Sequence, residues 1–402
     1  MFYNFHCRSE HVLLQQIVED VLAKLNTALL NITTDFLVGL ETRVQRVIQF
    51  IESQSNKVCL IGIWGMGGSG KTTTAKFIYN EIHWKFRDRS FIENIREVCE
   101  KRNGEIIHLQ EQLLALKTNE KIYNPSHGIA TIEKKLMGKR ALIVLDDVNT
   151  MEQVEKLFGN PKCFSSGSVL IVTSRDVNIL QLLKVDCIYN IKEMDKDKSL
   201  ELFSWHAFRK PSPTKEFSEL STSIVAYCGG LPLALEVIGS FLRGKTKENW
   251  ISARSKLKRI PNNRVQEKLK ISYDGLKDDM EKDIFLDICC FFIGKDRAYV
   301  SEILDGCGLC AIIGITVLIE RSLLKVEKNN KLGMHGLLRD MGREIVRQKS
   351  AEKLGKRSRL WFHEDVHDVL NQNSVRTLST FNLKLVIILH HLTKIFCLFL
   401  IV

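Results

Sequence analysis

A glycine-rich segment between Gly65 and Thr72 has the residue types and spacing of a phosphate-binding loop. It reads G-M-G-G-S-G-K-T, which satisfies the pattern G-x-x-x-x-G-K-[ST]. Glycines in such a loop let backbone N–H groups turn inward around phosphate oxygens, while the lysine neutralises the outer phosphates and the threonine hydroxyl is a ligand for Mg²⁺. We therefore expect a bound nucleotide, contacted by Gly65, Gly67, Gly68, Ser69, Gly70, Lys71, Thr72 and Thr73.

Two acids, Asp146 and Asp147, end a second apolar run further along the chain, Ala141–Leu145. In proteins with a phosphate loop, one acid in this position holds Mg²⁺ through water and a neighbouring acid can orient the attacking water. We expect Asp146, with Thr72, to hold Mg²⁺, and Asp147 to take a hydrolytic role. A solvent-facing strand end is the alternative for the Asp-Asp pair alone.

Arg175 follows a third apolar run, Val169–Val172, within the sequence Thr173-Ser174-Arg175. A guanidinium can bind a phosphate through two parallel N–H bonds, so we expect Arg175 to contact the terminal phosphate and to assist catalysis. A surface ion pair with Asp176 is the alternative.

Short strand-like runs and helix-like stretches alternate around these residues. The strand-like runs are Val58–Ile63, Ser90–Ile95, Ala141–Leu145, Val169–Val172 and Cys187–Ile191. The helix-like stretches between them are Thr72–Ile82, Leu109–Leu116, Ile129–Leu136, Met151–Phe158 and Val177–Leu183. This alternation predicts an α/β P-loop NTPase domain, with a parallel sheet, helices on both faces and ligands at the carboxyl ends of the strands.

Beyond about Asp195 the pattern is mainly helical, with a β-like pair at Leu323–Glu327 and Leu332–Met334. Helices with a short hairpin indicate a winged-helix unit. The domains we expect are an N-terminal linker helix (1–35), the P-loop nucleotide-binding domain (36–192), a helical domain (193–261), a winged-helix domain (262–350), and a linker with an apolar tail (351–402).

The net charge of +11 is spread over the 402 residues, with a basic run from Arg339 to Arg359. Since no aromatic residues are interleaved with this run, a solvated helix face followed by a loop is favoured over a nucleic-acid contact. The 11 cysteines form no disulfide framework and no secretory signal is evident, which favours a cytoplasmic location, with the nucleus as an alternative.

The apolar segment Phe381–Val402 is long enough to reach across a bilayer, but Lys384 and Lys394 interrupt it. Membrane association through this segment is one reading. The favoured reading is an out-of-frame or read-through end of a truncated chain.

These motifs, in this order, resemble the NB-ARC nucleotide-binding region of plant immune receptors of the NLR family. The motifs that carry the resemblance are G-I-W-G-M-G-G-S-G-K-T at Gly62–Thr72, F-I-E-N-I-R-E-V at Phe91–Val98, L-I-V-L-D-D-V at Leu142–Val148, V-T-S-R-D at Val172–Asp176, C-G-G-L-P-L-A-L at Cys228–Leu235, F-L-D-I-C-C-F-F at Phe285–Phe292, and M-H-G-L-L-R-D-M-G-R-E-I-V-R at Met334–Arg347. Asn149, where the coiled-coil sub-type usually has tryptophan, favours the sub-type that carries an N-terminal TIR domain.

The resemblance implies an ADP/ATP-binding switch in plant defence, with hydrolysis at most a slow reset. It implies that Val38 and Gly39 line the adenine, that Pro232 packs on the nucleotide, and that His335 reaches the β-phosphate of ADP. It also implies assembly with itself or with full-length receptors.

This sequence departs from the family pattern at three points. The family's Met-His-Asp reads Met334-His335-Gly336, no TIR domain precedes the match, and no leucine-rich repeats follow it. We therefore expect a truncated receptor without NAD-cleaving chemistry, with reduced retention of ADP. A decoy or adaptor that pairs with full-length receptors, a steadily turning-over ATPase and a winged-helix nucleic-acid binder are the alternatives.

Overall fold

The computed structural model describes residues 30, 36–54, 56–101, 106–114, 122–159, 164–349, 357–361, 365, 367 and 369. These residues form two compact units. The first unit contains the residues up to Ile63 with Lys71–Ser174 and Leu182–Tyr189; the second contains Trp64–Gly70, Arg175–Gln181 and the residues from Asn190 onward. The expected helix near the N-terminus and the apolar segment Phe381–Val402 lie outside the described residues.

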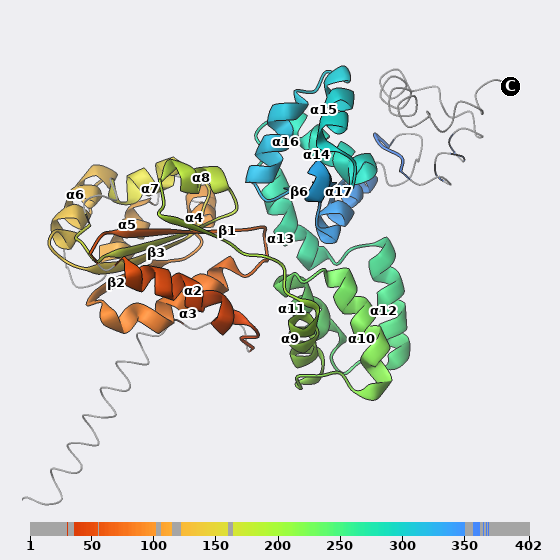
Figure 1. The fold of residues 1–402 in the computed structure, drawn as a ribbon, viewed down its shortest axis with the longest axis horizontal. Coiled ribbons are helices and arrows are strands. Elements are labelled where there is room, and N and C mark those ends of the chain that lie inside the picture. Colours follow the sequence, from red (N-terminus) through yellow and green to blue (C-terminus); the bar gives the residue numbers. More distant parts are fainter. Residues whose placement is uncertain are drawn as a thin grey trace, which may run out of the picture. The chain divides into compact units, whose positions relative to one another are not determined.

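The first unit is built on a five-stranded parallel sheet with the strand order β2-β3-β4-β1-β5 (Figure 1). The strands are β1 (Cys59–Trp64), β2 (Asp88–Ile92), β3 (Ala141–Val148), β4 (Val169–Ser174) and β5 (Cys187–Asn190). Strands β3 and β4 are parallel, with Leu142 opposite Val169, and nearly all of their residues are buried. Strands buried on both faces have continuous apolar sequences, which is why these runs predicted the sheet correctly.

Helices cover both faces of this sheet. They are α2 (Leu40–Ser53), α3 (Lys71–Ile82), α4 (Ile95–Lys101), α5 (Ile106–Leu114), α6 (Pro125–Leu136) and α7 (Met151–Phe158). Helix α8 (Val177–Leu182) belongs almost entirely to the second unit. Figure 1 shows α2 and α3 on one side of the strands and α5, α6 and α7 on the other. The predicted α/β architecture is confirmed.

The predicted strand Ser90–Ile95 is wrong at its carboxyl end. Strand β2 ends at Ile92 and Ile95 already belongs to α4. The backbone of Asn94 has a φ of 53°, in the left-handed region that asparagine tolerates better than most residues. This turn, together with the polar residues Glu93 and Asn94, separates the strand from Ile95.

The second unit is largely helical. It contains α9 (Lys196–Phe208), α10 (Ser218–Cys228), α11 (Pro232–Leu242), α12 (Lys247–Arg259), α13 (Asn263–Asp274), α14 (Asp279–Asp287), a π-helical turn (Ile288–Phe292), α15 (Arg297–Gly306), α16 (Ala311–Glu320) and α17 (Gly336–Gln348). Strands β6 (Lys325–Val326) and β7 (Leu332–Gly333) form the predicted antiparallel hairpin between α16 and α17. The indole of Trp250 on α12 is fully buried against Phe203, Phe208 and Phe217.

A short segment after α17 returns to the winged-helix part of the second unit. Arg359 forms ion pairs with Asp287 (2.5 Å) and Asp283 (2.9 Å) of α14, and the side chains of Arg359 and Asp287 are both buried. Trp361 lies against the guanidinium groups of Arg343 and Arg347 on α17. Segment 357–361 is therefore attached to two helices.

The basic run seen in the sequence is partly used within the fold. Besides these contacts, Arg343 donates to the carbonyl of Cys289 (3.0 Å) and Arg347 pairs with Glu344 (3.3 Å).

No helix within the described ranges is long and apolar enough to cross a membrane.

Candidate functional site

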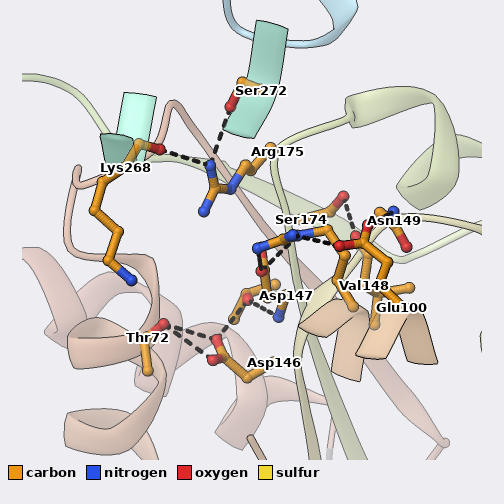
Figure 2. Close-up of polar contacts among 12 residues, drawn as sticks. Thr72, Glu100, Asp146, Asp147, Val148, Asn149, Ser174, Arg175, Lys268 and Ser272 are labelled. Carbon is orange, nitrogen blue, oxygen red and sulfur yellow. Dashed lines mark hydrogen bonds and ion pairs between the residues drawn. The ribbon is translucent and has the colours of Figure 1, made fainter. Parts of the chain in front are cut away.

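A buried carboxylate and two threonines form the polar centre of the first unit. Thr72, in the first turn of α3, directs its hydroxyl at both oxygens of Asp146 on β3 (2.9 and 3.0 Å), as Figure 2 shows. Thr173 on β4 donates to the same carboxylate at 2.7 Å. Asp146 has no exposed surface. The two predicted magnesium-binding residues, Thr72 and Asp146, are thus in direct contact.

This arrangement fits a divalent cation. Burial raises the pKa of Asp146, and the hydrogen bonds from Thr173 and Thr72 only partly oppose this effect. A nearby cation would stabilise the charged carboxylate. Within the described ranges, no group of three His, Cys, Asp or Glu side chains could hold a metal alone. A Mg²⁺ ion here would therefore need phosphate oxygens and water to complete its coordination.

Asp147 contacts Arg96, which lies in the F-I-E-N-I-R-E-V motif but was given no role in the sequence analysis. The Nε and Nη2 atoms of Arg96 on α4 both lie 2.9 Å from Oδ2 of Asp147. The backbone of Asp147 has a φ of 59°, and its N–H donates to the Thr173 hydroxyl (2.9 Å), where the register between β3 and β4 shifts. The hydrolytic role of Asp147 stays a prediction, but one of its oxygens already accepts two guanidinium bonds.

The loop from Gly65 to Gly70 joins β1 to α3 and belongs to the second unit. Gly68 and Gly70 have φ values of 77° and 94°, which residues with a Cβ rarely adopt. A Cβ on Gly68 would also lie 2.8 Å from Cβ of Leu233, whose N–H donates to the Gly68 carbonyl (3.3 Å). Pro232, at the start of α11, is close enough that its Cγ would contact a Cβ on Gly70 (3.9 Å).

One polar atom of this loop lacks a protein partner. The Ser69 hydroxyl is buried, and no described residue forms a hydrogen bond with it. Leaving a buried hydroxyl unpaired is costly. A phosphate oxygen is an acceptor of the kind that this loop is expected to bind, so Ser69 fits a bound phosphate.

A pocket with a cavity volume of about 130 Å³ opens beside this loop within the second unit. Its lining includes Gly65, Met66 and Ser69 of the loop, residues 190–193 after β5, Gly230–Pro232 before and at the start of α11, residues 322–325 before and within β6, and Met334, His335 and Leu338. The pocket brings four of the predicted residues together: Gly65, Ser69, Pro232 and His335.

His335 caps α17 and is nearly buried. Its Nδ1 accepts from the N–H of Leu337 (3.2 Å), so Nε2 carries the proton and donates to the carbonyl of Gly229 (3.0 Å). Gly229 ends α10 with a φ of 59°, and a Cβ there would lie 2.7 Å from Nε2 of His335. Burial lowers the pKa of His335 despite the hydrogen bond to Gly229, so the imidazole is neutral at pH 7.

Arg175 lies directly after β4 and contacts α13. Its Nη1 donates to the carbonyl of Lys268 (3.2 Å) and to the hydroxyl of Ser272 (3.1 Å), as Figure 2 shows. Asp176, the alternative partner, instead lies 3.7 Å from Arg321. The expected role of Arg175 at a terminal phosphate stays a prediction.

The remaining predicted residues lie next to α2 and in α3. Val38 and Gly39 form the turn before α2, where Gly39 has a φ of 71°. Lys71, which is buried, and Thr73 belong to the first turn of α3. Their contacts with a nucleotide stay predictions. Arg96, Lys268 and Ser272 were missed because each is an ordinary helix residue whose partner is distant in sequence.

Comparison with known proteins agrees with this description. The NB-ARC domain family matches residues 40–213, and the family described as "Disease resistance protein Roq1-like, winged-helix domain" matches residues 278–350. The chain is 42% identical over 329 residues to disease resistance protein RUN1 of Vitis rotundifolia, covering 81% of this chain and 24% of that protein. It is 36% identical over 372 residues to TMV resistance protein N of Nicotiana glutinosa, covering 90% of this chain and 32% of that protein.

Among solved structures, the chain is similar to a Walker-type ATPase of Pyrococcus abyssi. The TM-score is 0.55 and the identity 14%, over 76% of this chain and 96% of that chain. A likeness at this identity concerns the fold alone.

Fold and phosphate loop together define a P-loop NTPase-like domain followed by a helical region and a winged-helix domain. More particularly, the chain contains an NB-ARC nucleotide-binding domain and a Roq1-like winged-helix domain, and it is homologous over most of its length to plant disease-resistance proteins of the TIR–NLR class. It spans about a quarter to a third of the length of the relatives it matches.

Proposed function

We propose that this chain is an ADP/ATP-binding switch of plant innate immunity, in which the nucleotide bound to the Gly65–Thr72 loop sets the conformation. In this proposal ADP belongs to the silent form, ATP with Mg²⁺ belongs to the active form, and hydrolysis is a slow reset. The active form assembles with itself or with full-length receptors.

The observation that carries the proposal is the pocket beside the phosphate loop. Glycine and serine of the loop, Pro232 of the first turn of α11 and His335 at the start of α17 line one cavity. A ligand in such a cavity would touch the loop, the helical part and the winged-helix part at once. Binding energy could then be coupled to the arrangement of these parts, as a switch requires.

Two further observations favour a switch over a steadily working ATPase. The carboxylate expected to orient the attacking water, that of Asp147, is bonded to Arg96. The guanidinium expected to contact a terminal phosphate, that of Arg175, is bonded to α13. Both groups would have to exchange partners before hydrolysis, which supports a slow reaction.

The direct test is to identify the nucleotide that the purified protein carries and to measure its affinity. We expect mass spectrometry to find co-purified ADP, and calorimetry to give binding of ADP and of Mg²⁺ with a non-hydrolysable ATP analogue. Lys71→Ala should abolish binding. Lys57→Ala, an exposed lysine just before β1, is the matched control and should bind as the wild type does. A folded wild type that binds neither nucleotide would refute the proposal.

The metal and assembly parts of the proposal have their own measurements. In the wild type, the affinity for the ATP analogue should be higher with Mg²⁺ than with EDTA. Asp146→Asn keeps the shape of the side chain and should remove this difference.

Assembly is measured by light scattering, which should give a larger mass with the ATP analogue than with ADP. Equal masses, both for the chain alone and for the chain mixed with a full-length relative, would contradict assembly.

A further inference from the structure

The guanidinium of Arg175 is held by one helix of the second unit through a pair of acceptors. The Lys268 carbonyl and the Ser272 hydroxyl lie one turn apart on α13 and both accept from Nη1, at 3.2 and 3.1 Å. The backbone of Arg175 is fixed as well, because its carbonyl accepts from the indole of Trp64 (3.3 Å) and from the hydroxyl of Ser322 (3.3 Å). Both the backbone and the guanidinium of Arg175 are therefore held by hydrogen bonds, the guanidinium by those to α13.

This guanidinium lies against the phosphate loop. A Cβ placed on Gly67 would be 2.9 Å from Nη1 of Arg175 and 3.2 Å from the carbonyl oxygen of Lys268. Both the positive charge and the helix that holds it thus contact the loop at Gly67. A guanidinium in this position is suited to bind a phosphate.

The bonds to α13 and a bond to a phosphate exclude one another at Nη1. That nitrogen carries two hydrogens, and each has an acceptor on α13. A terminal phosphate that accepts from Nη1 must displace the Lys268 carbonyl, the Ser272 hydroxyl or both. A diphosphate, which has no terminal γ group, leaves these bonds intact.

We propose that α13 competes with the terminal phosphate for Arg175, and that Ser272 is a positioning residue that lowers the affinity for ATP relative to ADP. This inference rests on the proposed nucleotide-binding function. Loss of the Ser272 hydroxyl removes one of two competitors. A single hydrogen bond to a charged group corresponds to roughly a tenfold change in an equilibrium constant.

The test compares the dissociation constants of ADP and of a non-hydrolysable ATP analogue in matched variants. Ser272→Ala should strengthen binding of the analogue relative to ADP by roughly tenfold. Ser272→Thr, which keeps the hydroxyl, should restore the wild-type ratio. Ser255→Ala is the matched control: this hydroxyl on α12 bonds to the carbonyl of Ile251 in its own helix, so its loss should not change the ratio.

Arg175→Ala separates competition from a general loosening of α13. Removing the guanidinium should weaken binding of the analogue, and adding Ser272→Ala to that variant should then leave the ratio unchanged. Thermal unfolding of each variant shows whether it is folded. Two results would overturn the inference without contradicting the proposed switch. In the first, folded Ser272→Ala has the wild-type ratio of the two dissociation constants. In the second, Ser272→Ala shifts this ratio by the same factor in the Arg175→Ala background. If wild type binds neither nucleotide, the switch and this inference both fall.

Discussion

The Nε2 atom of His335 lies 3.0 Å from the carbonyl oxygen of Gly229, so the N-cap residue of α17 is bonded to the C-cap residue of α10. Because Nδ1 accepts from Leu337, the imidazole is fixed as the neutral tautomer that donates from Nε2. A second proton would remove that acceptor and place a charge in a buried site. The bond at Nδ1 to Leu337 therefore requires the neutral histidine, whereas the bond from Nε2 to Gly229 does not.

We predict that stability falls with acidification because of His335. Burial lowers its pKa below the ordinary value of 6.5, so the unfolded chain binds the proton first as the pH falls. The contribution is complete above about pH 6.5 and is lost below it, by at most about 1.4 kcal/mol per pH unit. Glu193 and Asp340 act against the shift, and Lys325 adds to it.

The measurement is the free energy of unfolding against pH for wild type and for His335→Asn. Asparagine can still accept from the Leu337 N–H as a helix cap, but it does not titrate. The difference between the two curves isolates His335 from the other histidines. A difference that is constant across this pH range would contradict the prediction.

Gly336 follows His335 in the first turn of α17, and we predict that Gly336→Asp slows the release of ADP. The structure has room for the side chain, since no atom beyond the neighbouring residues and the backbone of its own helix lies within 4 Å of a Cβ built there. A carboxylate near a helix N-terminus contributes about 0.3–1 kcal/mol, and a charge-assisted hydrogen bond about 1.5–3 kcal/mol. Release should therefore slow by roughly 2-fold to 100-fold. Stopped-flow displacement of a fluorescent ADP gives the rate, with Gly336→Asn as the uncharged control; equal rates for Gly336→Asp and wild type would contradict the idea.

Arg96→Met should raise the rate of ATP hydrolysis. The substitution keeps a long side chain on α4 but removes both bonds to Oδ2 of Asp147. A carboxylate released from a guanidinium is a better acceptor for the proton of an attacking water, and we expect a gain of about tenfold under single-turnover conditions. Adding Asp147→Asn should abolish the gain. An increase that survives this second substitution would show that Arg96 acts in another way.

Arg359→Met should destabilise the protein by about 3–5 kcal/mol, because it breaks the buried ion pair with Asp287. Arg357→Met is the matched control: its partner Asp365 is more exposed than Asp287, and we expect a loss of about 1 kcal/mol or less. Chemical denaturation measures both. Combining Arg359→Met with Asp287→Asn should recover part of the loss, and a double variant as unstable as the sum of the two single variants would refute the pairing.

The sequence predicted the sheet well because local patterns specify its strands. Continuous apolar runs mark the buried strands. The glycines of the Gly65–Thr72 loop likewise form one short motif with Lys71 and Thr72. Helix α12 lacks such a local pattern. Its sequence is rich in lysine, arginine and serine and has no regular apolar stripe, and among its described residues only Trp250 is buried.

The partners of the site residues could not be predicted in the same way. Asp147 and Arg96 are 51 positions apart, and Arg175 and Ser272 are 97 apart. Arg96 stands in the F-I-E-N-I-R-E-V motif, but nothing in the motif names its partner, and Ser272 stands in none of the motifs. Their roles arise only when α4 and α13 are packed, so motifs identified the groups that could do chemistry but not the groups that restrain them.

The attachment of segment 357–361 has a mechanical consequence. Arg359 is fixed to α14 while Trp361 is fixed to α17, so tension on the chain beyond Trp361 is shared by two helices of the winged-helix part. A pulling force would therefore rotate the winged-helix part as a whole and would not detach α17 alone.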